Sequence, residues 1–226
     1  MATTLANKAK LGEITTINQS FGWMFVGLLV TTISSLLITS SPTLTNAVIN
    51  NPFIYFGLII AELIVVFILS AKIQSMTFSE AVIAFLLYSF LNGLTLASIF
   101  VVYTTISIVS TFLVTTIVFG IMALYGYTTN RDLTSIGNLA IMALIGVIVA
   151  SLVNLFLKSG TFSYILSFLS VVIFIGLTAY DTQKIKEMES YSDNKNLGIL
   201  GALTLYLDFI NIFLNLLRLF GRQRED

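Results

Sequence analysis

The chain has 226 residues, of which 57% are hydrophobic and only 10% charged, and its mean hydropathy is +0.97. So few charges cannot cover the surface of a soluble domain, whereas a surface that faces lipid needs none. Eleven basic residues balance eleven acidic ones, which gives no basis for a nucleic-acid partner.

The chain contains neither cysteine nor histidine. The absence of cysteine excludes disulfides, thiolate metal sites and cysteine nucleophiles. Without histidine, any pH response near neutrality has to come from carboxyl groups. No glycine-rich phosphate loop and no Ser/His nucleophile arrangement is present, so we expect neither an enzyme nor a bound cofactor.

Seven apolar segments reach the roughly 20 residues that a helix needs to span a bilayer, which predicts an all-α membrane protein. In chain order they are 21–40, 53–71, 81–103, 108–127, 139–157, 162–180 and 197–220. Pro42 and Pro52 bracket the first connection, and the short stretch from Thr104 to Ser107 predicts a tight hairpin. We expect a polar N-terminal segment (1–20), one seven-helix domain (21–220) and a short charged tail (221–226).

The distribution of lysine and arginine predicts a cytoplasmic N-terminus, because basic residues favour the inner side of a membrane. The inner side then holds Lys8, Lys10, Lys72, Arg131, Lys184, Lys186 and Lys195. Seven complete crossings would place Arg218, Arg222 and Arg224 outside, unless the last segment does not cross fully. The retained first helix and short tails fit a bacterial plasma membrane, although an endoplasmic reticulum protein would look similar.

Two aspartates, Asp181 and Asp208, lie at the edge of or inside the last two apolar segments, where an ionisable group is costly. If the two helices meet at a short turn between Met188 and Gly198, the carboxyl groups lie about 10 and 15 Å below it and can face each other. Two touching carboxyls cannot both ionise cheaply, so they should share a proton. Both ionised, they would form a hard-oxygen site for Ca²⁺.

Polar residues recur along the last segment at steps of three or four and therefore share one helix face. They are Gly201, Thr204, Asp208, Asn211, Asn215 and Arg218. The stripe is either a hydrogen-bonded seam that holds the helices together or a polar pathway. The carboxylate in its middle favours the pathway.

Two further charged residues could belong to this site. Glu62 lies in the middle of the second segment without a neighbouring cation, and is either a buried protonated carboxyl or a third acidic member. Lys72 closes the same segment. It is either a residue that snorkels to the interface or a salt-bridge partner that holds Asp181.

An intramembrane aspartyl protease is a weak alternative. Tyr180-Asp181 matches half of that signature, but the other half needs Gly-x-Gly-Asp where this chain has Leu205-Tyr206-Leu207-Asp208. Without the glycines the backbone cannot open beside the aspartate.

The two aspartate segments, 176–186 (GLTAYDTQKIK) and 202–218 (ALTLYLDFINIFLNLLR), resemble the Bax inhibitor-1 family, also called the transmembrane Bax-inhibitor-motif family. Segments 61–63 (AEL), 70–73 (SAKI) and 90–96 (FLNGLTL) add to the resemblance, which covers nearly the whole chain. It implies a bundle whose last helix is wrapped by the other six. It also implies a pH-sensitive Ca²⁺ leak with Asp181 and Asp208 as the sensor. Where the family often has a latching arginine, this chain offers Lys72, which cannot form a bidentate pair.

The leading hypothesis is therefore a calcium leak channel in a lipid bilayer, formed by a monomer and gated by protonation of Asp181 and Asp208. Ca²⁺ would be the permeant or bound ion. The first alternative is a membrane interaction protein that regulates a membrane protease or a cell-death partner, with structural aspartates. The second is a proton-coupled carrier of an organic solute.

Overall fold

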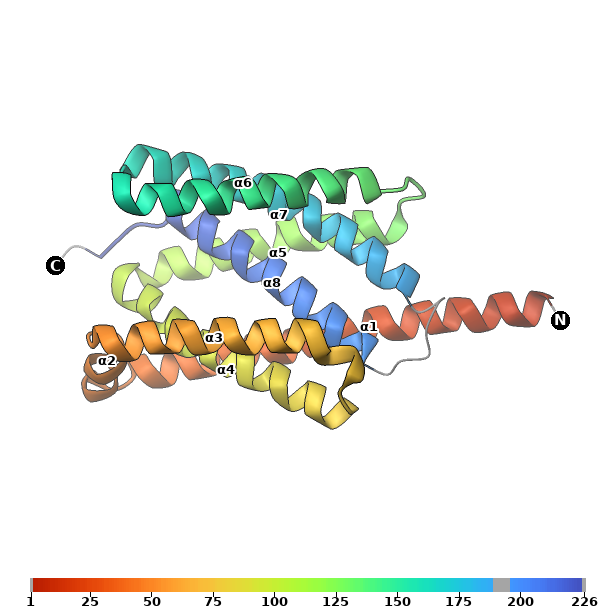
Figure 1. Ribbon diagram of the computed structural model, residues 1–226, viewed down its shortest axis with the longest axis horizontal. Helices are drawn as coiled ribbons and strands as arrows, with labels where there is room; N and C mark the ends of the chain where they lie inside the picture. The colour runs from red at the N-terminus through yellow and green to blue at the C-terminus, as the bar shows by residue number, and fades with distance from the viewer. Residues whose placement is uncertain (1, 189–195, 225–226) are drawn as a thin grey trace. The chain divides into compact units, whose positions relative to one another are not determined.

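The computed structural model describes residues 2–188 and 196–224, with side chains from residue 16 onward. This part of the chain is helical and contains no β-strand (Figure 1). The α-helices are α1 (Ala2–Thr39), α2 (Pro42–Val48), α3 (Pro52–Lys72), α4 (Phe78–Val102), α5 (Thr105–Thr128), α6 (Thr134–Leu157), α7 (Gly160–Met188) and α8 (Leu197–Phe220). Seven of these helices are long and apolar enough to cross a membrane, which confirms the predicted all-α fold with seven spanning helices.

Two helices extend furthest beyond the apolar segments that predicted them. Helix α1 begins at Ala2 rather than at residue 21, and α7 continues past Tyr180 to Met188. Both extensions contain Lys, Glu, Gln or Ala, which favour helix without being apolar. Lys195 lies outside the described residues, as do the side chains of Lys8 and Lys10.

Local sequence signals fix several helix starts. Asn51 caps α3 by accepting hydrogen bonds from the N–H groups of Phe53 and Ile54, and Pro52 occupies the first turn. Thr77 and Glu80 form a capping box at the start of α4. The connection expected between Pro42 and Pro52 contains the short helix α2, which also starts with its proline.

The helices form two compact units. Unit 1 holds α1 to α4 and the first part of α8, up to Tyr206. Unit 2 holds α5 to α7 and the rest of α8, from Leu207. The predicted enclosure of the last helix by the other six concerns both units together and stays a prediction.

In unit 1, α1 and α4 approach closely at Gly93. A Cβ at this position would lie 1.9 Å from Ser34 Oγ and 2.5 Å from the carbonyl oxygen of Thr31. The close approach lets Ser35 Oγ donate a hydrogen bond to the Gly93 carbonyl at 2.6 Å. Small residues and hydroxyl groups hold helices together in this way where water is absent.

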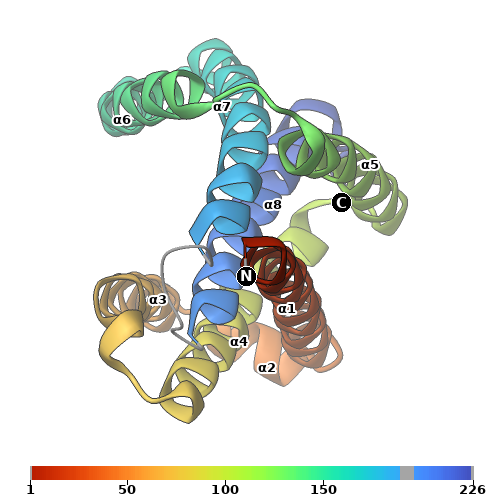
Figure 2. The same ribbon diagram turned by 90° about the vertical axis from the view of Figure 1, so that its right-hand side faces the viewer.

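In unit 2, α7 is the helix against which α5 and α6 pack, and Figure 2 shows α6 alongside α7. Gly126 of α5 lies against the carbonyl of Ala179, and Gly137 of α6 lies against the ring of Tyr180. Gln183 donates to the Arg131 carbonyl and accepts from the Leu133 N–H, which ties α7 to the start of α6.

Residues just before and just after α8 make contacts within unit 1. Just before α8, the Asn196 amide donates to the carbonyls of Ile73 and Met76, beside the start of α4. After α8, the Arg224 N–H donates to the carbonyl of Val102, the last residue of α4. Helix α8, at 24 residues, is also long and apolar enough to cross a membrane. The side on which the basic tail lies stays a prediction. The predicted orientation of the N-terminus stays a prediction.

The contact between α5 and α7 predicts a stability difference between two glycines of α5. In Gly126→Ala the new Cβ would lie 2.1 Å from the Ala179 carbonyl oxygen, so the helices must separate. We expect a loss of about 1–3 kcal/mol in the free energy of unfolding. Gly120→Ala is the matched control, because its Cβ meets nothing within 4 Å. Thermal unfolding of both variants in detergent tests this, and an equal effect of the two substitutions would contradict it.

Candidate ion and proton site

The structure brings Asp181 of α7 and Asp208 of α8 together within unit 2, where a side-chain hydrogen bond joins their carboxyl groups. Helix α7 ends at Met188 and α8 begins at Leu197, so the aspartates lie about 10 and 16 Å along their helices from these ends. An ionised carboxylate is only an acceptor, so a hydrogen bond between two carboxyls requires a proton on one of them.

The two aspartates have different surroundings. Asp208 is only 3% exposed, and its Oδ2 has no hydrogen-bond partner among the described residues. Asp181 is half-buried and interacts electrostatically with Lys184, an exposed residue one turn further along α7. A buried, unpaired oxygen costs about 1–3 kcal/mol. It is the kind of atom that a proton, a water molecule or a cation would satisfy.

Aromatic packing sets the rotation of α8 next to the pair. The ring of Phe209 makes edge contacts with Phe112 and Phe119 of α5, at centroid distances of 5.3 and 5.5 Å. Phe112 also contacts Phe213, one turn further along α8. Because Phe209 follows Asp208 directly, these rings hold the aspartate on its side of the helix.

The other members of the predicted polar stripe mainly bond to their own helix. Thr204, Asn211 and Asn215 donate to the carbonyls of Leu200, Leu207 and Asn211. Arg218 reaches α7, where its Nη1 donates to Ser167 Oγ at 3.3 Å. A hydrogen-bonded seam that holds helices together would instead make most of its hydrogen bonds between helices. The observed bonds therefore give little support to the interpretation of the stripe as such a seam.

Glu62 has neutral partners of its own in unit 1. Its carboxyl oxygens face Asn92 Nδ2 and Thr95 Oγ1, the latter at 2.9 Å. The amide oxygen of Asn92 in turn accepts from the hydroxyl of Tyr206, at 2.8 Å. Thr31 of α1 completes the network at 2.6 Å from the same hydroxyl. This network joins α1, α3, α4 and the first part of α8.

Sequence reasoning missed these partners of Glu62. Asn92 and Thr95 lie in the middle of an apolar span, as Glu62 does, and α3 and α4 are antiparallel and in contact. The sequence signal that could have indicated this contact is the presence of polar residues at similar depth on consecutive spans.

Lys72 and a Ca²⁺ ion are the other proposed members of the site. Lys72 is exposed in the last turn of α3, and its proposed role as a latch for Asp181 stays a prediction. No group of three or more His, Cys, Asp or Glu side chains gathers within the described residues. A Ca²⁺ ion at Asp181 and Asp208 would therefore take its remaining ligands from backbone, amide or water oxygens.

Comparison with known proteins identifies the family. The sequence model of the family described as "Inhibitor of apoptosis-promoting Bax1" matches residues 14–225. The chain belongs to the Bax inhibitor-1 family.

Several relatives match the chain over most of its length. The inner membrane protein YbhL of Escherichia coli (strain K12) is 49% identical over 95% of this chain and 94% of its own. An uncharacterized protein of Borreliella burgdorferi is 42% identical over 91% of both chains. An uncharacterized membrane protein of Streptococcus pyogenes serotype M1 is 44% identical over 79% of both. This Bax inhibitor-1 family member is thus a multi-pass integral membrane protein.

The hydrogen bonds of Tyr206 predict a loss of stability on removal of its hydroxyl. Tyr206→Phe leaves Asn92 Oδ1 without its donor inside a buried network, and we expect a cost of about 1–2 kcal/mol. Tyr55→Phe is the control, because the Tyr55 hydroxyl is half-buried and makes longer contacts of 3.1 and 3.3 Å. Unfolding in detergent should rank Tyr206→Phe as the more damaging change; the opposite ranking would argue against the network.

Proposed function

We propose that this protein is a pH-sensitive calcium leak channel in which protonation of Asp181 and Asp208 controls the passage of Ca²⁺. The observation that carries the proposal is the hydrogen bond between two carboxyl groups inside apolar helices, next to a buried carboxyl oxygen without a partner. Membership of the Bax inhibitor-1 family supports it.

The pair can act as a switch because the hydrogen bond between its two carboxyl groups depends on a proton. While one proton is shared, the bond ties α7 to α8. When both carboxyls ionise, the bond is lost, and two negative charges about 4 Å apart repel by about 4 kcal/mol at an effective dielectric constant near 20. The helices then separate locally, or a cation takes the place of the proton.

The composition of the site suits passage better than storage of Ca²⁺. The ion binds six to eight oxygens in stable protein sites. Two carboxylates supply at most four oxygens, so the remaining ligands would be water, backbone or amide oxygens, which carry no charge. A weak site of this kind lets an ion enter and leave, which conduction requires.

The first test is Ca²⁺ flux into liposomes that contain the purified protein and a Ca²⁺-sensitive dye, measured across a pH series. We expect Asp208→Asn to change the flux and to flatten its pH dependence, because an amide cannot ionise. Asp132→Asn is the matched control: it makes the same chemical change at an exposed residue in the connection between α5 and α6. The control should behave like wild type.

The outcomes separate the hypotheses. Unchanged flux and pH dependence in a folded Asp208→Asn variant would refute the gating role. Absence of flux with the wild-type protein, together with lower stability of the variant, would favour an interaction protein with structural aspartates. Saturable transport of an organic solute would instead indicate a carrier.

The second test measures competition between protons and Ca²⁺. Protonation removes negative charge from the pair, so the apparent Ca²⁺ affinity should fall as the pH falls, by up to about tenfold per pH unit for each displaced proton. Calorimetric titration of wild type and Asp181→Asn at several pH values checks this. A pH dependence that survives unchanged in Asp181→Asn would show that Asp181 does not exchange a proton for Ca²⁺.

A further inference from the structure

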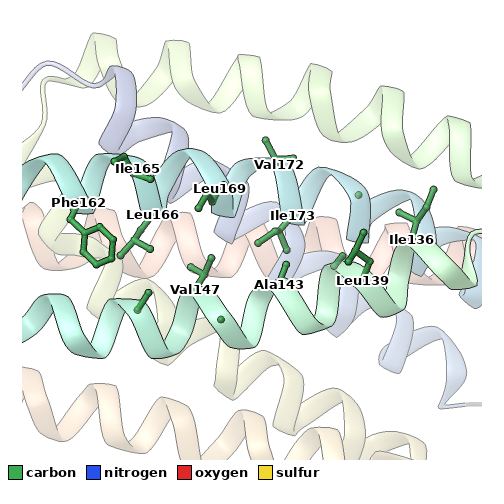
Figure 3. Close-up of a pocket in the computed structure, with 14 residues that line it drawn as sticks. Ile136, Leu139, Ala143, Val147, Phe162, Ile165, Leu166, Leu169, Val172 and Ile173 are labelled. Carbon is green, nitrogen blue, oxygen red and sulfur yellow. The ribbon is translucent and has the colours of Figure 1, made fainter.

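A groove of about 570 Å³ runs between α6 and α7 within unit 2 (Figure 3). The side chains that line it are all apolar. Both helices contribute, with Leu139, Ala143 and Val147 on α6 and Leu166, Leu169 and Ile173 on α7. The groove is separate from the aspartate pair, since neither aspartate lines it.

Small residues on α6 create the groove. Ala143, Gly146 and Ala150 line it, and a Cβ added at Gly146 would meet nothing within 4 Å. In contrast, the space beside Gly126 and Gly137 of the same unit is filled by neighbouring atoms. A groove on a spanning helix pair has to be occupied, because its walls otherwise lose their dispersion contacts.

The length of the groove fits a hydrocarbon chain. It extends from Ile136 to Ala150 along α6, which is about 21 Å at 1.5 Å per residue. One leaflet occupies about half of the roughly 30 Å hydrocarbon core. The groove is therefore long enough for one acyl chain of one leaflet.

One end of the groove carries an aromatic ring and a cation. Val172, Gly176, Tyr180 and Lys184 follow one another at steps of four on α7, and the first two line the groove. The Tyr180 ring packs against Gly137, next to Ile136 at the groove's end. The ammonium group of Lys184 lies 5.5 Å from the centre of that ring.

Charges of both signs lie near this end. Asp181 interacts electrostatically with Lys184, which stays exposed. Arg131 is exposed in the connection before α6, and Lys186 Nζ donates to the Tyr127 carbonyl. Asp132 is the acidic residue of that connection; hydrogen bonds from the side chain and the N–H of Thr134 lower the pKa of its carboxyl. Tyrosine and basic residues together are typical of the level at which lipid headgroups lie.

We propose that the groove between α6 and α7 binds one acyl chain of an anionic phospholipid, whose phosphate group contacts Lys184. The apolar walls suit an acyl chain, because it needs no polar contact. Lys184 and Tyr180 lie where the headgroup would be, and Lys184 supplies the charge that is complementary to the phosphate. A second copy of the protein is the competing occupant, because Gly146 and Ala150 have the spacing at which helices pack against each other. The exposed ammonium group of Lys184 beside the Tyr180 ring favours the lipid. The proposal does not depend on Ca²⁺ transport.

The test is lipid binding to the full-length protein. Delipidated protein in detergent is titrated with phosphatidylglycerol or with phosphatidylcholine of the same acyl chains, and native mass spectrometry counts the bound lipids. We expect one phosphatidylglycerol to bind more tightly than phosphatidylcholine. Lys184→Gln should remove this preference, because it weakens the binding of phosphatidylglycerol more than that of phosphatidylcholine.

Two glycine variants test the groove itself. In Gly146→Leu the new side chain fills the groove and displaces about two methylenes of the lipid, which should weaken the binding of both lipids on the order of tenfold. Gly120→Leu of α5 is the control, because that position is equally open but lies outside the groove. Its binding should match wild type. Ala143→Leu repeats the test at a second position that lines the groove.

Three results would overturn the proposal. The first is equal binding of the two lipids by wild type, and the second is wild-type binding by Gly146→Leu and Ala143→Leu. The third concerns the competing occupant. Because the chain has no cysteine, Ala143→Cys introduces a single thiol. Efficient disulfide-linked dimers of this variant in membranes would show that a second copy occupies the groove.

Discussion

Polar groups inside the spanning helices have to find their partners within the protein, because the surrounding hydrocarbon offers none. This constraint accounts for most of the specific contacts in the structure. Described hydroxyl groups of α1, such as that of Ser35, donate to backbone carbonyls, and the amides of Asn211 and Asn215 donate to their own helix. The carboxyl groups are harder to satisfy, and each of them required a dedicated arrangement of neighbouring side chains.

Two different solutions are found for these carboxyl groups. Glu62 faces an amide and a hydroxyl, which are neutral at every pH relevant to a cell. Asp208 instead faces another carboxyl, Asp181, and keeps one oxygen without a described partner. Only the second arrangement reverses from attraction to repulsion when a proton leaves. For this reason the proposed function assigns the response to pH to the aspartate pair.

Glycine has two opposite uses in this membrane protein. At Gly93 and Gly126 the missing side chain allows neighbouring backbones to touch, which tightens each unit. At Gly146 no neighbour fills the space, so the same residue type leaves a groove on the surface. The sequence does not distinguish these uses, because the difference depends on what lies opposite each glycine.

The sequence by itself determined the seven spanning helices, the depth of Asp181 and Asp208 and the family. These properties depend on the apolar content of about 20 consecutive residues, on the rise of a helix and on local motifs. It also allowed the two aspartates to be placed at similar depth, because the connection between their helices is short.

Only the tertiary structure decided which side chains meet. It paired Glu62 with Asn92 and Thr95 and left an open groove beside Gly146. Mean hydropathy does not contain this information, because it does not say which helix lies opposite a given face. The partners of a polar residue are therefore set by which helix lies next to it and how each helix is rotated, and these are fixed only when the helices pack.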